Sequence, residues 1–495
     1  MERKELLTHL SFGTQVAEDE RKELARYFVE TDQWRKISND EIDVIRGEKG
    51  SGKSAIYALL LEKESEFFDK RILITAGESP RGATVFRDLI TEPPATEAEF
   101  ILLWKLYIVS LIAREMRKYD INRKEASAVY RVLENEHLLE TQSSLAALLR
   151  RVQQTTKKLI QSVTIEGSVT IDPSTGTPLA SGKISLKEPL GEERDRGSLS
   201  VDSLFSLLSK ALKDENFKVW VLLDRLDVAF IDNHELEANA LRALMRVYND
   251  VKGFDNISVK IFIREDIWKR ITQGGFREAS HIIRFVLLDW SPPSLLNLLM
   301  RRILSNDIIA NVFQIDKTAV LQNAMKQEAL FSRLFPAQVE QGPQKAPTFK
   351  WMITRCADGT RKTAPRELIH LLNCLREQEV RRLEQGGMGA PGDQLFDRSV
   401  FKQALPTVSN ARLNQYLYAE YPNQRPFLEK LDGQKTEHTP HSLAALWDKR
   451  NSEATVIARD LVELGFFEER GTKEEPTFWV PFLYRDALQM IQGKA

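Results

Sequence analysis

The octapeptide GEKGSGKS at residues 47–54 constrains the fold of this chain more than any other feature of its sequence. It fits the pattern G-x-x-x-x-G-K-[ST] without a mismatch, and it lies between a predicted short strand and a predicted helix. Glycines in such a loop let backbone amides curl around phosphate oxygens, and the following helix points its positive end at them. We therefore expect a phosphate-binding loop in an α/β fold, with a glycine-rich turn that binds nothing as the alternative.

The residues of this loop are predicted to bind ATP and Mg²⁺. Lys53 is expected to reach the β- and γ-phosphates, and Ser54 is expected to hold the metal ion. The sequence has no evident N-K-x-D motif for reading guanine, which favours adenine as the base. The other predicted cofactor-binding positions of the loop are Gly47, Glu48, Lys49, Gly50, Ser51, Gly52 and Ala55.

A second acidic residue, at the end of a neighbouring strand, is needed to complete the magnesium shell of a P-loop. The segment WVLLDRLD supplies one, because Asp224 follows the apolar run 220–223 and is the candidate Walker B aspartate. Asp227 is a candidate for orienting water or the metal, with a cap on the following segment as the alternative. Related ATPases often place a catalytic glutamate directly after the Walker B aspartate, but Arg225 stands there. We therefore expect slow hydrolysis and leave the general base open.

Two arginines are candidates for contacting the γ-phosphate. The strand VKIFI runs into Arg264 at its carboxyl end, where ligands collect in open α/β sheets. An ion pair between Arg264 and Asp266, or another neighbour such as Glu265, is the alternative. Arg366 follows Pro365 in the segment TAPREL, which opens a helix, and a surface arginine in a first helical turn is the alternative there.

Short apolar runs alternate with amphipathic helical segments along the chain, which predicts a parallel sheet. The predicted strands are 42–45, 71–75, 218–224, 259–263 and 282–288. The fold class is therefore α/β, a P-loop NTPase with a parallel sheet, a helical insertion, a helical lid and a C-terminal winged-helix-like domain. The predicted segments are 1–96 and 201–305 for the two halves of the ATPase core, 97–200 for the insertion with a β-hairpin, 306–385 for the lid and 394–495 for the winged-helix-like domain, after a Gly/Pro-rich linker.

Composition excludes several classes of protein. The chain has 495 residues, which suggests about three domains, and 70 Lys plus Arg against 71 Asp plus Glu leave a net charge of −1. Nucleic acid would therefore have to meet a local basic patch. Cys356 and Cys374 are too few for a disulfide framework, which favours a reducing compartment, by default the cytoplasm. The start lacks the apolar core of a signal peptide and the most apolar stretch, 100–113, is short, so no membrane contact is expected.

The motifs GEKGSGKS, VLLDRLD, FIRED and APRELIHLL, in this order and before a winged-helix-like tail, resemble the STAND and initiator-type branch of AAA+-like P-loop ATPases. With the preceding FGTQVAEDERKELARYFVETDQW, residues 10–380 look similar to bacterial ATPases near the KAP group. The resemblance implies that Arg264 reads the γ-phosphate and that Pro365 and Arg366 act from the lid. Such proteins are often encoded in defence islands, so it also implies an anti-phage or DNA-associated role. The Walker B glutamate and a repeat sensor domain are the departures from the pattern.

These features favour a Mg²⁺/ATP-dependent switch that orders an oligomer or a partner surface, in anti-phage defence together with an effector protein. Arg270 and Arg277 are candidates for reaching a neighbouring subunit of a homo-oligomer, with solvated arginines as the alternative. The insertion 97–200 is the candidate partner surface, unless it is an inert addition.

Two other classes of function compete with the switch. An ATP-regulated DNA-binding protein, of the initiator or DNA-maintenance type, would use Lys449, Arg450 and Arg459 of the winged-helix-like domain against phosphates. A nuclease or protease is disfavoured, because His438 and His441 lack further ligands nearby and no nucleophile constellation is present.

Overall fold

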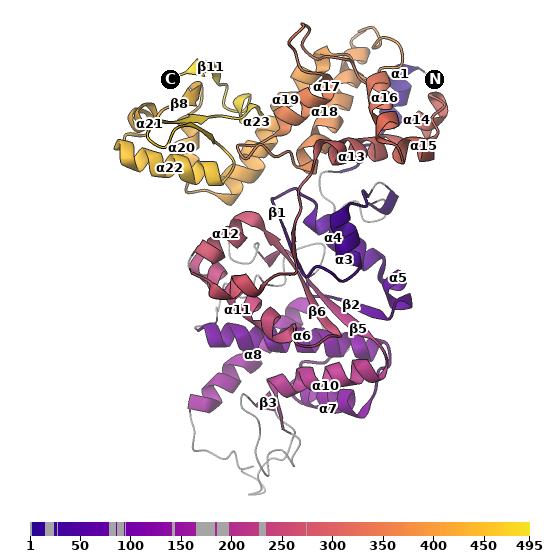
Figure 1. Cartoon of the computed structure of the whole chain (residues 1–495), viewed down its shortest axis with the longest axis vertical. Helices are drawn as coiled ribbons and strands as arrows, with labels where there is room; N and C mark the ends of the chain where they lie inside the picture. Colours follow the sequence, from indigo (N-terminus) through magenta and orange to yellow (C-terminus); the bar gives the residue numbers. More distant parts are fainter. Residues whose placement is uncertain are drawn as a thin grey trace, which may run out of the picture. The chain divides into compact units, whose positions relative to one another are not determined.

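A computed structural model describes residues 2–14, 24–26, 28–78, 86, 94, 96–140, 144–164, 184–185, 198–226, 234–273 and 275–495 of the chain (Figure 1). They belong to two compact units, each with its own hydrophobic core. The sheet unit comprises 32–47 and 53–287, and the C-terminal unit comprises 1–31, 48–52 and 288–495. The eight-residue phosphate loop is therefore shared: its first residue and its last two belong to the sheet unit, and its middle five to the C-terminal unit.

Five parallel strands form the main sheet of the sheet unit, in the order β2-β5-β6-β1-β7. They are apolar runs because helices cover both faces of the sheet. This confirms the parallel sheet that the sequence predicts, although the first strand begins two residues later than predicted, with Ile42 buried before it. The strands are β1 (Val44–Gly47), β2 (Ile72–Ala76), β5 (Lys218–Leu223), β6 (Ile257–Arg264) and β7 (Phe285–Leu287).

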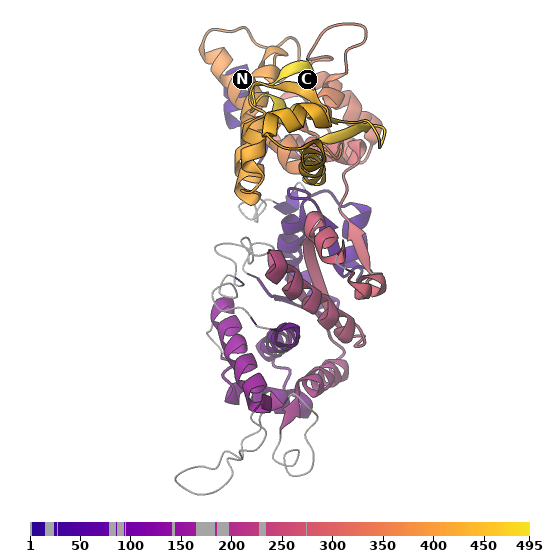
Figure 2. The ribbon, with the colours of Figure 1, turned by 90° about the vertical axis from the view of Figure 1, so that its left-hand side faces the viewer.

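Helices flank the sheet on both sides (Figures 1 and 2). On one face the ring of Tyr57 in α4 meets the ring of Phe262 in β6 edge-on, at a centroid distance of 5.7 Å. On the other face lie α6 and α11, where Trp104 Nε1 donates a 2.9 Å hydrogen bond to the carbonyl oxygen of Ala240. The helices of this unit are α3 (Asp32–Ser38), α4 (Lys53–Glu62), α5 (Glu64–Asp69), α6 (Glu97–Lys118), α7 (Lys124–Asn135), α8 (Leu145–Thr164), α10 (Val201–Asp214), α11 (His234–Val251), α12 (Glu265–Gln273) and the 3₁₀ turn η4 (Arg277–His281).

Between β2 and β5, the described residues 97–140 and 144–164 contain α6, α7 and α8, in agreement with the helical insertion that the sequence predicts. Thr96 caps α6 by accepting a hydrogen bond from the amide of Glu99. The predicted hairpin around 163–187 falls mostly outside the described residues. Of its first predicted strand, 163–171, the structure describes only 163 and 164, and these two residues end α8 instead of forming a strand. At its end, β3 (Ile184–Ser185) pairs in parallel with β4 (Leu199–Ser200) rather than in a hairpin within the part that is described.

Helices dominate the first part of the C-terminal unit. Its core includes α1, whose buried Leu6 and Leu7 belong to the same hydrophobic cluster as residues of α18, and α1 contacts α14 and α18. Asn373 Nδ2 of α18 also donates a 2.9 Å hydrogen bond to the carbonyl oxygen of Gly13. Among the described helices of the chain, none combines the length and apolar character needed to cross a membrane. The helices here are α1 (Arg3–His9), α13 (Pro292–Leu304), α14 (Asp307–Val312), α15 (Lys317–Leu321), α16 (Ala324–Leu334), α17 (Thr348–Cys356), α18 (Pro365–Glu384) and α19 (Ser399–Arg412).

A winged helix follows, as the sequence predicts. A strand, two helices and an antiparallel strand pair succeed one another after a π-helical turn and a short helix. Thr439 caps the first of the two helices through a reciprocal pair of hydrogen bonds with Ser442. The sequence missed β8 and β11, which are short and polar. The elements are η5 (Leu413–Tyr418), α20 (Arg425–Glu429), β8 (Lys435–His438), α21 (Pro440–Trp447), α22 (Asn451–Glu463), β9 (Glu468–Gly471), β10 (Pro476–Trp479), α23 (Phe482–Arg485) and β11 (Ile491–Lys494), with the sheet order β11-β8-β10-β9.

Candidate functional site

The phosphate loop has the backbone that its glycines permit. Gly50 and Gly52 have φ angles of +86° and +99°, which side chains with a Cβ rarely adopt. The loop connects β1 to α4, and α4 begins at Lys53. Within the sheet unit, Lys53 Nζ donates a 2.7 Å hydrogen bond to the carbonyl oxygen of Gly47. Lys53, the predicted phosphate-binding lysine of the motif, therefore hydrogen-bonds to the first residue of the loop in this structure.

The carboxyl edge of the sheet carries the other predicted residues of this unit. Asp224 directly follows β5 and is 4% exposed. Arg264 ends β6 beside Gly47 in the strand register and is also buried. Its guanidinium forms two hydrogen bonds to the carboxylate of Asp266, at 3.1 and 2.7 Å. That ion pair is the alternative that the sequence left open, and it holds Arg264 at the strand end. Asp227 lies outside the described residues.

In the C-terminal unit, the middle of the phosphate loop packs against α18 and the segment before α13. Trp290 Nε1 donates a 2.8 Å hydrogen bond to the carbonyl oxygen of Ser51. A Cβ atom built on Gly50 would lie 3.0 Å from Cβ of Arg366 and 3.4 Å from Cβ of Ala364. Pro365, buried at the first position of α18, fixes that helix start. The structure therefore brings together the loop and the predicted lid residues Pro365 and Arg366.

Two buried polar atoms at this place have no hydrogen-bond partner in the part of the protein that the structure describes. They are the hydroxyl oxygen of Ser51 and Nε of Arg366. Buried polar atoms without a partner are uncommon in folded proteins, because each costs about 1–3 kcal/mol. Both can donate to a phosphate oxygen. Together with the left-handed glycines, they make this loop fit the triphosphate that its motif predicts.

A carboxyl pair adjoins the loop in the same unit. Glu48 forms a side-chain hydrogen bond with Asp358, which precedes α18. Burial, and then the negative charge of Asp358, raise the pKa of Glu48 to about 7. Asp358 in turn accepts hydrogen bonds from the amide and hydroxyl of Thr360, at 2.9 and 2.7 Å, and lies 3.6 Å from the guanidinium of Arg412. A proton on Glu48 removes a negative charge from the loop that is predicted to bind phosphates.

This carboxyl pair makes the stability of the chain depend on pH. The folded protein keeps a proton on Glu48 up to about pH 7, whereas the unfolded chain releases it near pH 4.5. The resulting stabilisation is complete below pH 4.5 and is lost as pH rises through 7. We expect the free energy of unfolding of wild type, relative to Glu48→Gln, to fall by about 2 kcal/mol between pH 5 and pH 8. Urea unfolding at several pH values measures it, and Glu66→Gln, an exposed glutamate, is the control. Parallel curves for wild type and Glu48→Gln would refute the shared proton.

The two candidate finger arginines differ in their surroundings. Arg270 forms an ion pair with the buried carboxylate of Glu237 in its own chain. Arg277 is exposed at the start of η4. Arg270 is therefore held by α11, and Arg277 retains the exposure that a contact with a neighbouring subunit requires.

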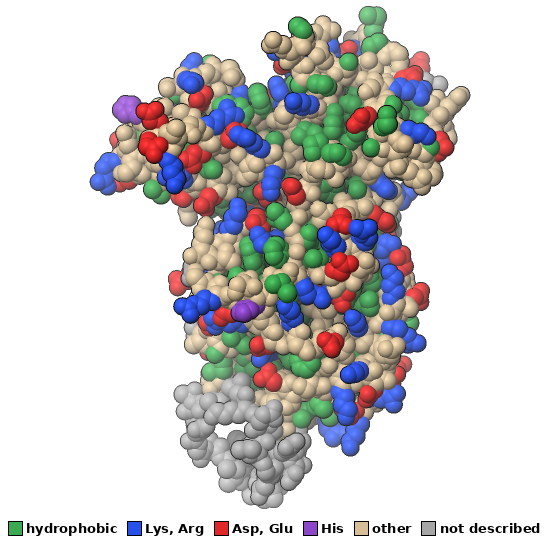
Figure 3. All heavy atoms as spheres, in the orientation of Figure 1, with side chains coloured by type: hydrophobic (Ala, Val, Ile, Leu, Met, Phe, Trp, Pro, Cys, Tyr) green, Lys and Arg blue, Asp and Glu red, His purple; other side chains and the backbone are tan. Residues whose placement is uncertain are grey.

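The arginines of the winged helix are paired with acidic neighbours. Arg450 binds Glu453 at 2.6 Å, and Arg459 binds Glu469 at 3.1 Å. Figure 3 shows positive and negative side chains interspersed over this domain, at the upper left of the view. Each pairing weakens the field that a DNA backbone would meet.

His438, which we considered as a metal ligand from the sequence, is buried in the winged helix next to the start of α21. Its Nδ1 lies 3.3 Å from Ser442 Oγ at the start of α21, and burial lowers its pKa. His441 is exposed on the next helix. Among the described residues no group of three or more His, Cys, Asp or Glu side chains gathers as a metal site.

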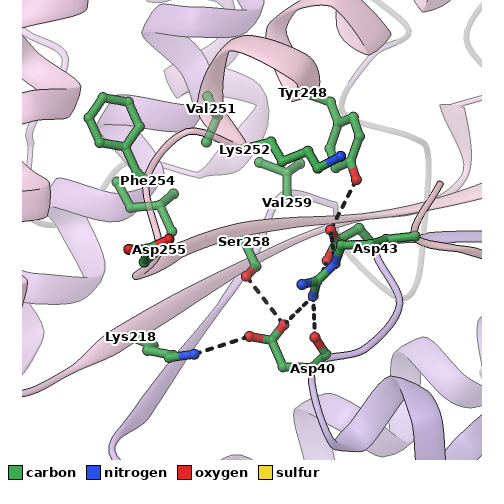
Figure 4. Close-up of a pocket in the computed structure, with 12 residues that line it drawn as sticks. Asp40, Asp43, Lys218, Tyr248, Val251, Lys252, Phe254, Asp255, Ser258 and Val259 are labelled. Atoms are coloured by element: carbon green, nitrogen blue, oxygen red, sulfur yellow. Dashed lines mark hydrogen bonds and ion pairs between the residues drawn. The ribbon is translucent and has the colours of Figure 1, made fainter. Parts of the chain in front are cut away.

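A cavity of about 260 Å³ lies at the opposite, amino edge of the main sheet (Figure 4). Beneath it, the ammonium group of Lys260 is completely buried and hydrogen-bonds to Asp43 Oδ1 at 2.9 Å and to the carbonyl oxygen of Ile42 at 2.7 Å. It also binds Asp40 and faces the ring of Trp220 at 4.5 Å. The positive and negative groups here pair with one another. We therefore interpret the cavity as the surface opening above a structural ion-pair network, which holds the amino-terminal parts of β1 and β6 together.

Comparisons with known proteins give weak likenesses. No protein-family model matches the chain. A protein of Escherichia coli K12, described as the transposon gamma-delta 80.3 kDa protein, is 25% identical over 271 residues, which cover 53% of this chain and 34% of that protein. The chain thus spans about a third of the length of this curated relative.

Three solved structures align over most of the chain at low identity. The ORC2 protein of Aeropyrum pernix, as ADPNP–ADP complexes, aligns over 93% of this chain and 91% of its own with 12% identity and a TM-score of 0.45. A Walker-type ATPase of Pyrococcus abyssi aligns over 94% and 96% with 11% identity and a TM-score of 0.41. The ORC1 protein of Aeropyrum pernix in complex with DNA aligns over 90% and 87% with 11% identity and a TM-score of 0.33.

Several residues around the loop were not found from the sequence. Trp290, Asp358 and Arg412 are distant from the motif along the chain and belong to no recognised pattern. Trp290 stands in DWSPP before α13, where its only signal is an aromatic residue next to a turn. Asp358 precedes a glycine, which reads as an ordinary turn. Such residues are found only when the tertiary structure brings them to the loop.

Proposed function

We propose that the chain is a Mg²⁺/ATP-dependent P-loop ATPase that acts as a nucleotide-controlled switch. The observation that carries the proposal is the phosphate loop, with left-handed Gly50 and Gly52 and the unpartnered polar atoms of Ser51 and Arg366 beside it. A loop with these properties on an α/β sheet has backbone donors and side-chain donors for a triphosphate, and little other use for them.

The residues of the loop and the strand ends take separate roles in this proposal. Lys53 leaves the carbonyl of Gly47 and binds the β- and γ-phosphates. Ser54 and Asp224 would hold Mg²⁺, which when bound offsets the negative charge of the phosphates. Arg264, released from Asp266 or shared with it, stabilises charge on the γ-phosphate at the strand end.

We propose that Arg366 couples the bound nucleotide to the conformation of the C-terminal unit. It contacts the loop at Gly50 and begins the helix that leads toward the winged helix. If its side chain binds the γ-phosphate, the ATP and ADP states differ in one charged contact at the start of α18. A ligand shifts an equilibrium only by its differential affinity for the two states, and this contact supplies such a difference. We propose that the difference controls assembly of the chain or access to a partner surface.

The test is phosphate release from ATP and GTP by wild type and by Lys53→Ala, each with and without duplex DNA. Loss of the lysine removes a donor to the phosphates whose negative charge rises in the transition state, so we expect the rate with ATP to fall by about 100-fold or more. The mass of each protein in the apo, ADP and ATP states reports assembly.

Lys63→Ala is the matched control, because Lys63 follows the same helix and pairs with Glu66 away from the loop. It is expected to keep the wild-type rate. Equal rates for wild type and Lys53→Ala would refute the ATPase. A wild-type mass that stays the same in all nucleotide states, with no partner bound, would refute the switch while leaving the ATPase in place.

The finer context of the switch is a further hypothesis. The family resemblance supports an effector partner and an anti-phage role, and the name of the Escherichia coli relative places that protein on a transposon. The second candidate function, an ATP-regulated DNA-binding protein, is favoured by the winged-helix topology of residues 435–479. Acidic residues outnumber basic ones between 449 and 475, which favours a protein partner for this surface over DNA. Stimulation of phosphate release by DNA would reverse that preference.

A further inference from the structure

A buried glutamate lies at the same edge of the sheet as the candidate Walker B aspartate. Glu78 comes two residues after β2 and is 0% exposed. No motif marks it in the sequence. Carboxylates are almost never completely buried without a structural or chemical reason.

The strand register places Glu78 level with Asp224. Ala76 pairs with Leu222 in the β2–β5 ladder, and the amide of Gly77 donates a 2.8 Å hydrogen bond to the carbonyl oxygen of Leu222. Continuing this register by two residues sets Glu78 opposite Asp224. The approach is tight, because a Cβ atom on Gly77 would lie 2.4 Å from the side chain of Leu223. A glycine is therefore required immediately before Glu78.

Two buried tyrosines hold this strand end in place. Tyr57 donates a 2.6 Å hydrogen bond from its hydroxyl to the carbonyl oxygen of Glu78, and Tyr107 donates a 2.8 Å hydrogen bond to the carbonyl oxygen of Gly77. Tyr57 belongs to α4, the helix that begins at Lys53. Burial, and then the negative charge of Glu78, raise the pKa of Tyr107, so that hydroxyl stays protonated as a donor. The backbone of Glu78 is thus tied directly to the helix of the phosphate loop.

At this edge of the sheet Asp266 is hydrogen-bonded to Arg264 and Asp224 is the proposed Mg²⁺ ligand, so hydrolysis of ATP calls for a further group. The attacking water must be oriented and must give up a proton, and a carboxylate is suited to both tasks. The position after Asp224, where a catalytic glutamate is expected, is Arg225, and its φ of +56° sets it in the left-handed region. A guanidinium cannot accept a proton.

We propose that Glu78 is the general base of the ATPase. Its carboxylate orients a water molecule and accepts a proton from it as the water oxygen forms a bond to the γ-phosphorus. The bond between the γ-phosphorus and the bridging oxygen breaks, and ADP leaves with that electron pair. The closed surroundings of Glu78 suit this step, because general bases act in sites that exclude bulk water. The inference rests on the proposed ATPase function and names its base.

Glu78→Gln tests the assignment, because it keeps the size of the side chain and removes its ability to accept a proton. We expect kcat to fall by about 100-fold or more, while the dissociation constant for ATP, measured with a fluorescent ATP analogue, stays within about threefold. A residue with only a structural role would change binding and thermal stability together with kcat. Glu115→Gln, which alters another buried glutamate of the same unit on α6, is the control and is expected to keep the wild-type kcat.

Glu78→Asp covers the case in which the glutamine variant fails to fold. It keeps the charge and withdraws the carboxylate by one methylene, so we expect at least a tenfold lower kcat with unchanged ATP binding and melting temperature. A wild-type kcat in either folded variant overturns the assignment of Glu78. That outcome differs from failure of the proposed function, in which wild type and Lys53→Ala release phosphate equally.

Discussion

Replacing Arg412 by methionine should lower the free energy of unfolding of the C-terminal unit by about 3–5 kcal/mol. The guanidinium is 6% exposed and donates a 2.9 Å hydrogen bond to Glu367, and it lies 3.6 Å from Asp358. Both carboxylates are equally buried. Methionine leaves them close together without a cation, which costs far more than the loss of the hydrogen bond alone.

The effect should reach the phosphate loop as well. Asp358 is the partner of Glu48, and Glu367 follows Arg366 in the first turn of α18. Without Arg412, the negative charge next to the loop is no longer offset, so ATP should bind more weakly than to wild type. Arg412 lies at the end of α19, and its guanidinium is 4.0 Å from the centre of the Tyr416 ring. The same side chain therefore also contacts η5.

Urea unfolding gives the stability of this variant, and hydrogen exchange of amides in α18 and α19 localises the loss. Arg425→Met is the matched control, because Arg425 is an exposed arginine in an ion pair with Glu429 one helical turn away. It is expected to leave the unfolding curve unchanged. The prediction would be wrong if Arg412→Met and Arg425→Met unfolded at the same urea concentration.

The order of strands and helices was largely predictable, because their signals are local. Val219–Leu223 is an unbroken apolar run, which is what a strand covered on both faces requires. The phosphate loop was predictable for the same reason, since its glycines and lysine are adjacent in the chain. β8 and β11 were missed, because KTEH and IQGK carry no apolar pattern and exist as strands only beside their partners.

The surroundings of the loop could not be predicted, because they depend on pairs of residues far apart in sequence. Glu48 and Asp358 are separated along the chain by residues 53–287 of the sheet unit and by helices of the C-terminal unit, and neither segment carries a pattern that predicts the other as its partner. Arg264 shows a different limit. Its place at the strand end followed from the pattern, but two acidic neighbours in FIRED left its partner undecided, and only the structure selects Asp266.

Lys260 is a further residue whose strand could be predicted from the sequence while its ion-pair partners could not. VKIFI predicts a buried strand, and a lysine in a buried strand has to be paired, but the sequence does not say with what. Its acidic partners Asp40 and Asp43 lie more than two hundred residues earlier, in the turn before β1. Burial alone would raise the pKa of Asp40, but the charges of Lys260 and Arg284 hold it below its ordinary value.

Replacing Lys260 by methionine should therefore lower the free energy of unfolding of the sheet unit by about 3 kcal/mol. Methionine fills a similar volume, so the cost arises from Asp40 and Asp43, which lose a buried cation. This loss is at the lower end of what breaking a buried ion pair costs, because Arg284 Nε still lies 2.7 Å from Asp43 and Lys218 Nζ lies 3.5 Å from Asp40. Urea unfolding of the full chain at neutral pH measures the change.

The pH dependence of this loss separates a charge effect from a packing effect. The lowered pKa of Asp40 contributes stability that is present above its ordinary value of 3.8 and is lost as pH falls. The difference between wild type and Lys260→Met should therefore shrink as the solution is acidified through that range, whereas a packing defect would persist. Lys210→Met, at an exposed ion pair with Glu125, should match wild type at every pH. If Lys260→Met also unfolds like wild type at neutral pH, the buried network does not hold the amino edge of the sheet, and the cavity above it would have to be reconsidered as a site for a ligand.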